Sequence, residues 1–242
     1  GQSTGSTADP AALRTLQDRV KRWLDLCREF GYKDVYFYGI DEAKGDRLAS
    51  QRLTWQAVQS AGGKTFVACY RKTFEAMGSL LDCAVPAGPP DAEEGAKWHS
   101  VGSQAFCYAN PQVGVEEAET YRRNFGLVLW RSGFDGAMDY AYQHGFAHVW
   151  NDFDSPRYRD HNFTYPTVTG VVDTLAWEGF REGVDDVRYV TTLEHAIANA
   201  SGAKKAVAGQ AKAWLDELDP KSANLYVTRA AMAQWIVRLS GK

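Results

Sequence analysis

The stretch DVYFYGIDEA, residues 34–43, decides the fold and raises the question of function. Aromatic and β-branched residues at its centre favour a β-strand, and Gly39 loosens the chain where that strand ends. Asp41 and Glu42 follow side by side, and like charges this close raise each other's pKa or turn apart. Two interpretations are open: the acids begin a helix, whose first turn favours them, or they form an acid/base pair.

Helix and strand patterns alternate on both sides of this stretch. Apolar residues recur at helical spacing from Pro10 to Phe30, and Gly31 suits a C-terminal stop. The expected strands are 34–40, 65–70, 81–85, 103–109 and 136–142. Helices are expected at 46–61 and 116–132, a helix or turn at 72–80, and a loop at 86–97. Such alternation with short connections predicts parallel βα units.

The predicted fold class is therefore α/β. A complete eight-stranded (β/α) barrel typically uses about 250 residues, whereas here five strands end by residue 142. The chain is expected to be the C-terminal five βα units of a barrel, or an open doubly wound sheet, and periodicity does not choose between them. The expected organisation is a terminal linker at 1–10, a partial barrel at 11–200 and a helical extension at 201–242.

The second half of the chain changes character after residue 143. An aromatic, polar segment there is too long for an ordinary connection, and helices are expected from about 173 and at 203–217 and 221–239. The helix from 173 mixes many charges with apolar residues, so some of its charges must be paired inside the protein. Glu178 and Arg181 are spaced to pair, and Arg181 is expected to stabilise the fold.

Composition excludes several classes of protein. The 242 residues are 45% hydrophobic and 13% aromatic, which supports a sizeable core, and a net charge of −3 argues against nucleic acid or a membrane surface as partner. No apolar run reaches the roughly 18 residues of a membrane helix, and no signal peptide is visible. Since a signal could have been removed upstream, the compartment stays open, with the periplasm or the cell exterior favoured over the cytoplasm.

Cysteines and histidines give no sign of a metal site. The four cysteines show no CxxC spacing, so buried free thiols are expected rather than zinc ligands or disulfides. His144 and His148 lie four residues apart, but in an expected loop and without an HExxH motif. No nucleophile elbow, dinucleotide fingerprint or phosphate loop is present either. We expect no metal and no cofactor.

Polar and aromatic residues gather where the expected strands end, which is where parallel sheets bind ligands. Besides Asp41 and Glu42, the candidate ligand contacts are Tyr70, Tyr108, Asn110, Tyr140, Tyr142, Trp150, Asn151 and Asp152. Aromatic rings stack on the C–H faces of sugars, while amides and carboxylates bond sugar hydroxyls. Core packing is the alternative for each single aromatic, but the cluster favours a carbohydrate ligand.

Two blocks of sequence carry a family resemblance. The segment YGIDEA at 38–43, and a Tyr-Pro-x-x-x-Gly lead-in followed by WEGFREGVDDVRYVTTL at 177–193, resemble the catalytic region of glycoside hydrolase family 123 and its relatives. The resemblance runs from about residue 34 to 195. It implies a barrel strand that ends in an Asp-Glu pair. It also implies retaining, exo-acting hydrolysis of β-linked N-acetylhexosamine by substrate-assisted catalysis, as in polysaccharide degradation.

The resemblance also implies roles for the two acids. Glu42 would be the general acid, which needs a raised pKa, and Asp41 would orient the 2-acetamido group whose carbonyl attacks the anomeric carbon. Adjacent side chains on an extended chain point in different directions, so each acid can address its own group. The usual retaining pair instead places two acids on separate elements about 5 Å apart.

The chain departs from the family in three ways. The pair belongs to the family's fourth barrel strand, so strands one to three and an upstream β-sandwich are not found here, and Tyr140 stands where relatives have Trp. Another chain or an upstream segment is therefore expected to complete the barrel. One further hypothesis is a glycosidase for sugars without an acetamido group, in which Asp139 or Asp152 would serve. Another is a non-catalytic carbohydrate-binding or assembly domain, and a third is an unrelated α/β protein that matches the family by chance.

Overall fold

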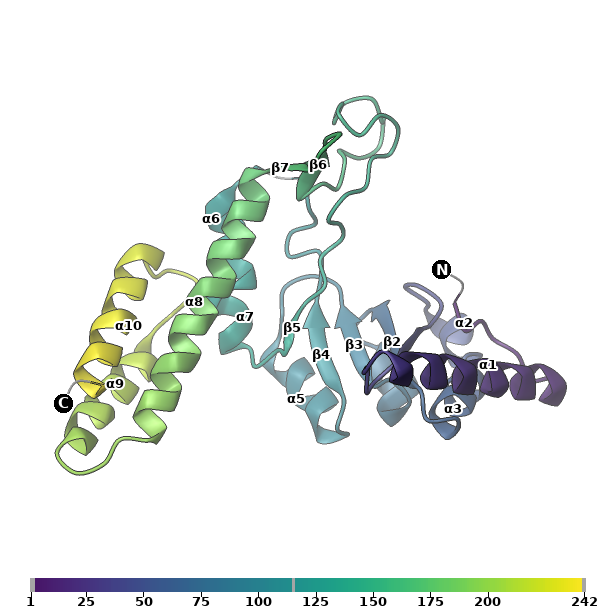
Figure 1. Cartoon of the computed structure of the whole chain (residues 1–242), viewed down its shortest axis with the longest axis horizontal. Coiled ribbons are helices and arrows are strands. Elements are labelled where there is room, and N and C mark those ends of the chain that lie inside the picture. Colours follow the sequence, from purple (N-terminus) through teal and green to yellow (C-terminus); the bar gives the residue numbers. More distant parts are fainter. Residues whose placement is uncertain (1–2, 115, 241–242) are drawn as a thin grey trace. The chain divides into compact units, whose positions relative to one another are not determined.

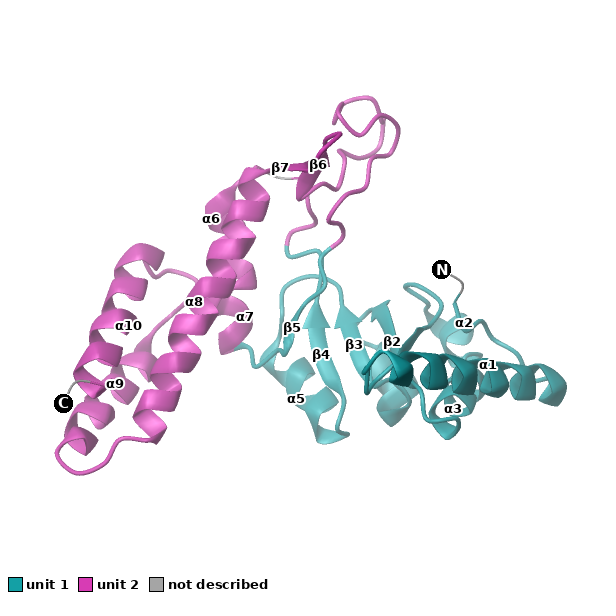
Figure 2. Ribbon diagram, viewed as in Figure 1, with its two compact units in different colours: residues 1–110, 132–139 teal, residues 111–131, 140–242 magenta. Residues whose placement is uncertain are grey.

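The structure is a computed structural model that describes residues 3–114 and 116–240, and the chain forms two compact units (Figures 1 and 2). Unit 1 comprises residues 1–110 and 132–139, and unit 2 comprises 111–131 and 140–242. The domain boundary expected at residue 200 falls inside unit 2 and stays a prediction.

Unit 1 is built on a five-stranded parallel sheet in the order β1-β2-β3-β4-β5. The strands are β1 Tyr36–Tyr38, β2 Lys64–Cys69, β3 Cys83–Pro86, β4 Gln104–Cys107 and β5 Gly136–Ala137. Chain order and spatial order coincide, so each strand lies beside its predecessor. The predicted α/β class and its five parallel strands are confirmed, although β5 keeps only the first two residues of the strand expected at 136–142.

The helices of unit 1 begin where local sequence signals place them. They are α1 Pro10–Glu29, α2 Gly45–Ala49, α3 Arg52–Ser60, α4 Thr73–Met77, the 3₁₀ turn η1 Gly78–Leu80 and α5 Ala92–Ser100. The Asp9 carboxylate accepts from two backbone N–H groups of the first turn of α1, and Pro10 occupies the first helical position. Leu16, Val20 and Leu24 of α1 are buried against α3, which lies beside it (Figure 1).

Two expectations for helices in the first half of the chain were wrong. The loop expected at 86–97 contains the start of α5, because the Asp91 carboxylate accepts from the N–H groups of Glu93 and Glu94 at 3.0 and 3.1 Å. The single helices expected at 46–61 and 116–132 are each divided into two. Gly126 separates the second pair of helices, and its backbone packs against Gly183.

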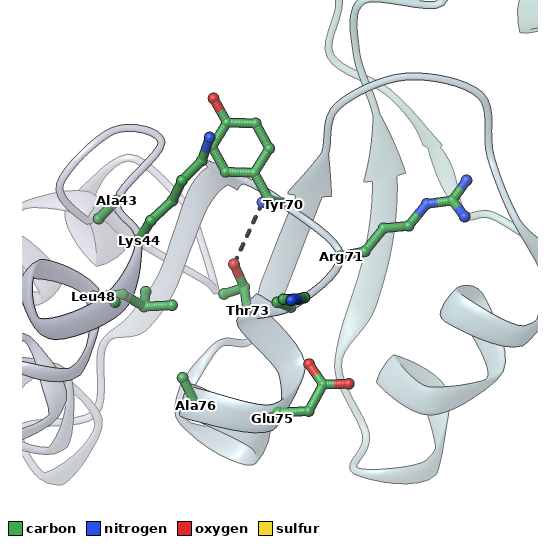
Figure 3. Close-up of a pocket in the computed structure, with 10 residues that line it drawn as sticks. Ala43, Lys44, Leu48, Tyr70, Arg71, Thr73, Glu75 and Ala76 are labelled. Carbon is green, nitrogen blue, oxygen red and sulfur yellow. Dashed lines mark hydrogen bonds between the residues drawn. The ribbon is translucent and has the colours of Figure 1, made fainter.

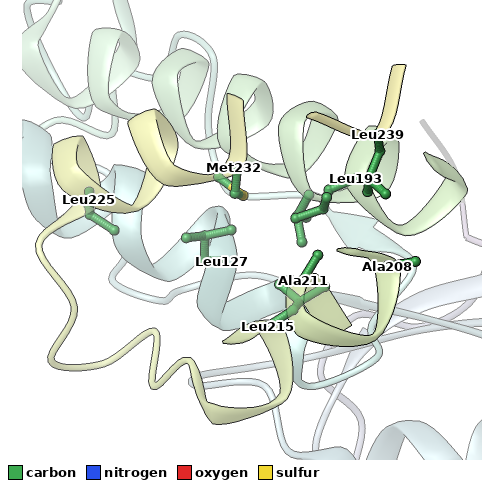
Figure 4. Close-up of a cluster of buried hydrophobic side chains, with 9 residues drawn as sticks. Leu127, Leu193, Ala208, Ala211, Leu215, Leu225, Met232 and Leu239 are labelled. Atoms are coloured by element: carbon green, nitrogen blue, oxygen red, sulfur yellow. The ribbon is translucent and has the colours of Figure 1, made fainter. Parts of the chain in front are cut away.

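Unit 2 is mainly helical. Its elements are α6 Ala118–Phe125, α7 Leu127–Arg131, β6 Thr164–Pro166, β7 Val171–Asp173, α8 Leu175–Ala198, α9 Lys204–Glu217 and α10 Leu225–Ser240. Leu127, Leu193, Leu215 and Met232 are buried in one core cluster contributed by α7, α8, α9 and α10 (Figure 4). The three helices predicted after residue 173 are confirmed. The antiparallel β6–β7 hairpin was not predicted, since its residues lay in an expected loop.

A buried ion cluster lies at the centre of unit 2. The fully buried Asp186 carboxylate of α8 accepts from Arg122 Nε at 2.7 Å and from Arg229 Nε at 2.5 Å. Arg229 also donates to Glu182 Oε2 at 2.6 Å. The prediction that some charges of this helix are paired internally is thereby confirmed. Arg181 does not belong to the cluster: its side chain is 56% exposed and pairs with Glu178 on the same helix.

Three of the four cysteines are buried in the structure. Cys69, Cys83 and Cys107 are buried free thiols, as predicted, and burial raises the pKa of each to about 12. Such thiols are protonated at neutral pH and unreactive as nucleophiles.

Within residues 3–114 and 116–240, no helix has the length and apolar character needed to cross a membrane.

Candidate functional site

The chain that leaves β1 is fixed against β2 by backbone hydrogen bonds. Gly39 N–H donates to Phe66 O and Glu42 N–H donates to Ala68 O, both at 3.0 Å. A Cβ on Gly39 would lie 2.7 Å from the Trp55 ring, so only glycine fits there. Helix α2 begins at Gly45, three residues after Glu42. The interpretation of the two acids as the first turn of a helix is therefore wrong.

Backbone strain marks two strand ends of this sheet. Glu42 has φ +49° and Ala109 has φ +52°, and these are the non-glycine residues with positive φ in the described part of the chain. Glu42 follows β1, and Ala109 follows β4. Left-handed backbone at non-glycine positions is uncommon and is often found at functional sites. The strain is therefore located where sequence reasoning placed the candidate ligand contacts.

Three tyrosines hold the two carboxylates apart. Tyr70 O–H donates to Glu42 Oε2 at 2.7 Å, and Tyr108 O–H donates to the other oxygen, Oε1. Tyr38 O–H donates to Asp41 Oδ1 and itself accepts the Ala68 N–H at 3.3 Å. Each acid thus has its own phenol donors, while both side chains remain exposed. The two carboxylates face different partners, but the reason differs from the expected alternation of an extended chain, because Asp41 and Glu42 lie in a turn and Glu42 has left-handed backbone.

The hydrogen bonds from the phenols set the charge of Glu42. The Tyr108 and Tyr70 donors hold the pKa of Glu42 below its usual value, and the nearby Lys44 ammonium acts in the same direction. A hydrogen bond to the charged form favours that form, so Glu42 is ionised at neutral pH in the ligand-free protein. This is opposite to the raised pKa expected of a general acid. Burial and the Glu42 carboxylate raise the pKa of Tyr108, which therefore stays a hydrogen-bond donor.

Asn110 and Asp139 follow β4 and β5, the last two strands of the sheet in unit 1. Asn110 is only 5% exposed, so its side chain is directed into the unit rather than toward solvent. The Asp139 carboxylate accepts the Ala109 N–H at 2.7 Å and so supports the strained backbone after β4. Asp139 contributes to the shape of this edge, and Asn110 is less accessible to a ligand than was expected.

A second group of the predicted residues lies in unit 2, on the segment after residue 140. The Trp150 and Tyr165 rings are stacked with centroids 5.1 Å apart, and Trp150 is 52% exposed. The Asp152 carboxylate accepts from Tyr165 O–H at 2.7 Å and pairs with Arg159 at 2.9 Å. Asp152 is therefore held in place by two neighbours, beside an exposed aromatic face suited to stacking.

The remaining predicted residues of unit 2 have local roles as well as exposed surface. Tyr140 and Tyr142 are about half exposed, at 49% and 51%, and the Tyr142 ring packs edge-on against Trp177. Asn151 accepts the Phe153 N–H at 3.3 Å and so shapes a tight turn. The structure thus brings Asp41, Glu42, Tyr70 and Tyr108 together in unit 1, and it groups Trp150 and Asp152 in unit 2.

A cavity of about 880 Å³ adjoins the acid pair inside unit 1 (Figure 3). Tyr70 links the two, because its ring lines the cavity and its hydroxyl bonds Glu42. Lys44 Nζ lies 3.7 Å from the centroid of that ring. Sequence reasoning singled out neither Lys44 nor Tyr38. The signal that could have found Tyr38 is its place on the last residue of β1, three positions before Asp41.

No family model matches the chain, and no curated protein matches it. Among the residues that the structure describes, no group of three or more His, Cys, Asp or Glu side chains could hold a metal ion. The resemblance to family 123 therefore stays a prediction that rests on the sequence blocks themselves.

Proposed function

We propose that this protein is a glycoside hydrolase of the family 123 type, acting on β-linked N-acetylhexosamine with Asp41 and Glu42 as its acids. One observation carries the proposal: adjacent carboxylates are held apart by separate tyrosine donors, on strained backbone at the carboxyl end of a parallel sheet. On this proposal the five-stranded sheet of unit 1 is the C-terminal part of a (β/α) barrel, completed by another chain or an upstream segment.

The proposed reaction retains configuration and uses the substrate's own acetamide. The acetamide carbonyl oxygen attacks the anomeric carbon, the bond to the leaving oxygen breaks, and Glu42 protonates that oxygen. Asp41 accepts the acetamide N–H and stabilises the positive charge that develops on the group. Water then opens the cyclic intermediate, with Glu42 accepting its proton.

Glu42 must gain a proton before it can act as an acid. In the ligand-free protein the two phenol donors favour its charged form. A sugar that takes over the hydrogen bond of Tyr70 or Tyr108 removes part of that stabilisation and excludes water, and both changes raise the pKa of Glu42. The tyrosines would thus keep the acid ionised until substrate is bound.

The ionised, exposed state of Glu42 favours a second candidate, a non-catalytic carbohydrate-binding domain. A carboxylate fixed by two phenols is a good acceptor for sugar hydroxyls and needs no proton for that role. The same residues then hold a sugar without cleaving it. Turnover separates the two candidates directly.

The test is hydrolysis of 4-nitrophenyl N-acetyl-β-galactosaminide and the matching glucosaminide by the purified chain. On unactivated oligosaccharides, Glu42→Gln is expected to lower turnover by a factor of about 10²–10⁴, with a smaller loss on the aryl substrates, whose leaving group needs little protonation. Asp41→Asn is expected to impair both, since it acts before the leaving group departs. Asp46→Asn, an exposed acid on α2, is the matched control and should change neither.

Equal losses on both kinds of substrate in Glu42→Gln would contradict its role as an acid. Full activity in Asp41→Asn would exclude assistance by the acetamide. If the folded wild-type chain binds N-acetylhexosamine but hydrolyses none of these substrates, the binding function replaces the catalytic one.

A further inference from the structure

The cavity beside the acid pair is lined by both apolar and positively charged side chains. Leu48 and Ala76 project into it from α2 and α4, and the Tyr70 ring lies across its upper side (Figure 3). Lysines 44 and 72 belong to its lining as well. Its volume of about 880 Å³ lies within the range of roughly 300–1,000 Å³ that is usual for ligand sites.

The charges of the lining do not cancel within the cavity. Its cations are Lys44, Arg71 and Lys72, and its acid is Glu75. Arg71 Nη1 lies 3.5 Å from Asp91, which is outside the lining, and Glu75 lies 3.6 Å from Lys97, also outside it. Arg71 and Glu75 therefore have partners elsewhere.

Lys44 and Lys72 are left without such partners. In the described part of the chain neither of them forms an ion pair, and both are exposed. Lys44 Nζ is held over the Tyr70 ring at 3.7 Å, a contact that leaves its N–H donors free to bind an anion. The cavity therefore combines an apolar wall with two lysines that form no ion pair among the described residues.

We propose that this cavity is a subsite for an acidic sugar unit, one that carries a carboxylate or a sulfate ester bound by Lys44 and Lys72. The C–H face of a pyranose would lie on Leu48, Ala76 and the Tyr70 ring, and its anionic substituent would reach the two ammonium groups. Lys44 also offsets the repulsion that Glu42 exerts on an anion in this position.

This inference rests on the proposed function, because it assigns the cavity to the sugar unit next to the one held at Asp41 and Glu42. Tyr70 connects the two positions, since one side chain both walls the cavity and donates to Glu42 at 2.7 Å. The substrate class would then be an acidic glycan in which an N-acetylhexosamine neighbours a uronate or a sulfated sugar.

The experiment measures binding separately from hydrolysis. Glucuronic acid, N-acetylgalactosamine 6-sulfate and neutral N-acetylgalactosamine are titrated into the ¹⁵N-labelled full chain, and amide shifts of Tyr70, Thr73 and Ala76 are followed. The variants are Lys44→Met, Lys72→Met and Lys72→Arg, with Lys21→Met on the exposed side of α1 as the matched control. Hydrolysis of the neutral aryl substrate is measured on the same samples.

We expect at least one acidic sugar to shift these amides and to bind about tenfold more weakly to Lys44→Met and Lys72→Met. Lys72→Arg and Lys21→Met should bind as the wild type does, and added salt should weaken the acidic sugars alone. Lys21→Met should also hydrolyse the neutral substrate at the wild-type rate. A response to glucuronic acid alone assigns a carboxylate, and a response to the sulfated sugar alone assigns a sulfate ester.

The inference is overturned if no acidic sugar shifts these amides, if neutral and acidic sugars bind alike, or if Lys21→Met weakens binding as much as Lys72→Met. Its failure differs from failure of the proposed function. Hydrolysis of the neutral substrate without preferential binding of acidic sugars would contradict the proposed subsite and support the proposed hydrolase activity. Binding of acidic sugars that depends on Lys44 and Lys72, without any turnover, would support the proposed subsite and contradict the proposed hydrolase activity.

Discussion

Two carboxylates in this protein show opposite ways of handling a charge. Asp186 in unit 2 is fully buried and receives hydrogen bonds from the guanidinium groups of Arg122 and Arg229. Glu42 in unit 1 is exposed, and its two donors are the neutral phenols of Tyr70 and Tyr108. A buried carboxylate needs cations to remain charged, whereas water already favours the charged form of an exposed one, and the neutral phenol donors orient Glu42 and lower its pKa further.

The difference indicates which carboxylate can take part in chemistry. The arginines hold Asp186 between α6, α8 and α10, and no solvent reaches it. A phenol can give up its hydrogen bond to a ligand without leaving a buried charge behind. The strained backbone at Glu42, with φ +49°, adds to the contrast, because α8 is regular at Asp186. Asp186 therefore stabilises the fold, and Glu42 is available to a ligand.

The largest expected effect in this comparison is on the buried side. Asp186→Asn leaves Arg122 and Arg229 with a neutral partner in the interior, which should lower the free energy of unfolding by about 3–5 kcal/mol. Asp185→Asn is the matched control, because the neighbouring Asp185 pairs with the largely exposed Arg188 and should contribute less than about 1 kcal/mol. Urea unfolding followed by circular dichroism measures both. Equal shifts in the two variants would contradict the structural role of the cluster.

The helix contact beside this cluster gives the next largest effect. A Cβ on Gly183 of α8 would lie 2.8 Å from Arg122 O of α6, so Gly183→Ala should destabilise the protein by about 1–3 kcal/mol. Gly209→Ala in α9 is the control, because nothing lies within 4 Å of the added methyl group. That variant should be more stable by up to about 1 kcal/mol, since alanine favours a helix over glycine. Thermal unfolding of both would test the contact, and destabilisation by Gly209→Ala would overturn this explanation.

The sequence predicted features that depend on neighbouring residues. Asp9 and Pro10 marked the start of α1, and the alternation of helix and strand predicted the parallel sheet of unit 1. The start of α5 was missed because the prolines and glycines before Asp91 resemble a loop, although Asp91 itself is a good N-cap. The β6–β7 hairpin was missed for a similar reason, since its strands have only three residues each.

Contacts between residues that are distant in the chain could not be predicted from the sequence patterns. The rule for strand ends placed Tyr70 and Tyr108 near Glu42, but not their hydrogen bonds, and Tyr108 lies 66 positions away. The lowered pKa of Glu42 follows from those bonds and so was predicted with the wrong sign. In α8 the pattern required some internal pairing without identifying Asp186, because its partner Arg229 lies 43 positions away.

On the exposed side, Tyr108→Phe is expected to raise the pKa of Glu42, because it removes the larger of the two hydrogen bonds that stabilise the carboxylate. Tyr70→Phe should raise that pKa less. Tyr36→Phe is the control, because Tyr36 O–H donates to Gln104 at 3.3 Å and not to Glu42. Titration of the Glu42 carboxyl carbon by ¹³C NMR measures the pKa in each variant. An unchanged pKa in Tyr108→Phe would remove the phenols as the cause.

The same shift makes stability depend on pH in a definite direction. A carboxyl group whose pKa is lower in the folded protein than in the unfolded chain stabilises the fold above the unfolded value. That contribution is lost as the pH falls from about 4.5 through the folded value. In Glu42→Gln, the free energy of unfolding should therefore fall less steeply than in the wild type as the pH is lowered through this range. Near neutral pH, the difference in that free energy between variant and wild type should not change with pH. A steeper loss in the variant would contradict the sign of the shift.

The smallest expected effect concerns Arg181, which the sequence had suggested as a stabilising residue. Its guanidinium pairs with Glu178 three residues earlier on α8, and both side chains are well exposed, at 56% and 41%. Water solvates both charges when such a pair is broken, so Arg181→Ala should leave the urea midpoint unchanged within error. Arg229→Ala on α10 should lower the midpoint strongly, because the buried Asp186 of α8 then loses a partner. If the two variants were equally destabilised, exposure would not distinguish charges that stabilise the fold from charges that are available to a ligand, and the assignment of Glu42 to the second group would lose its basis.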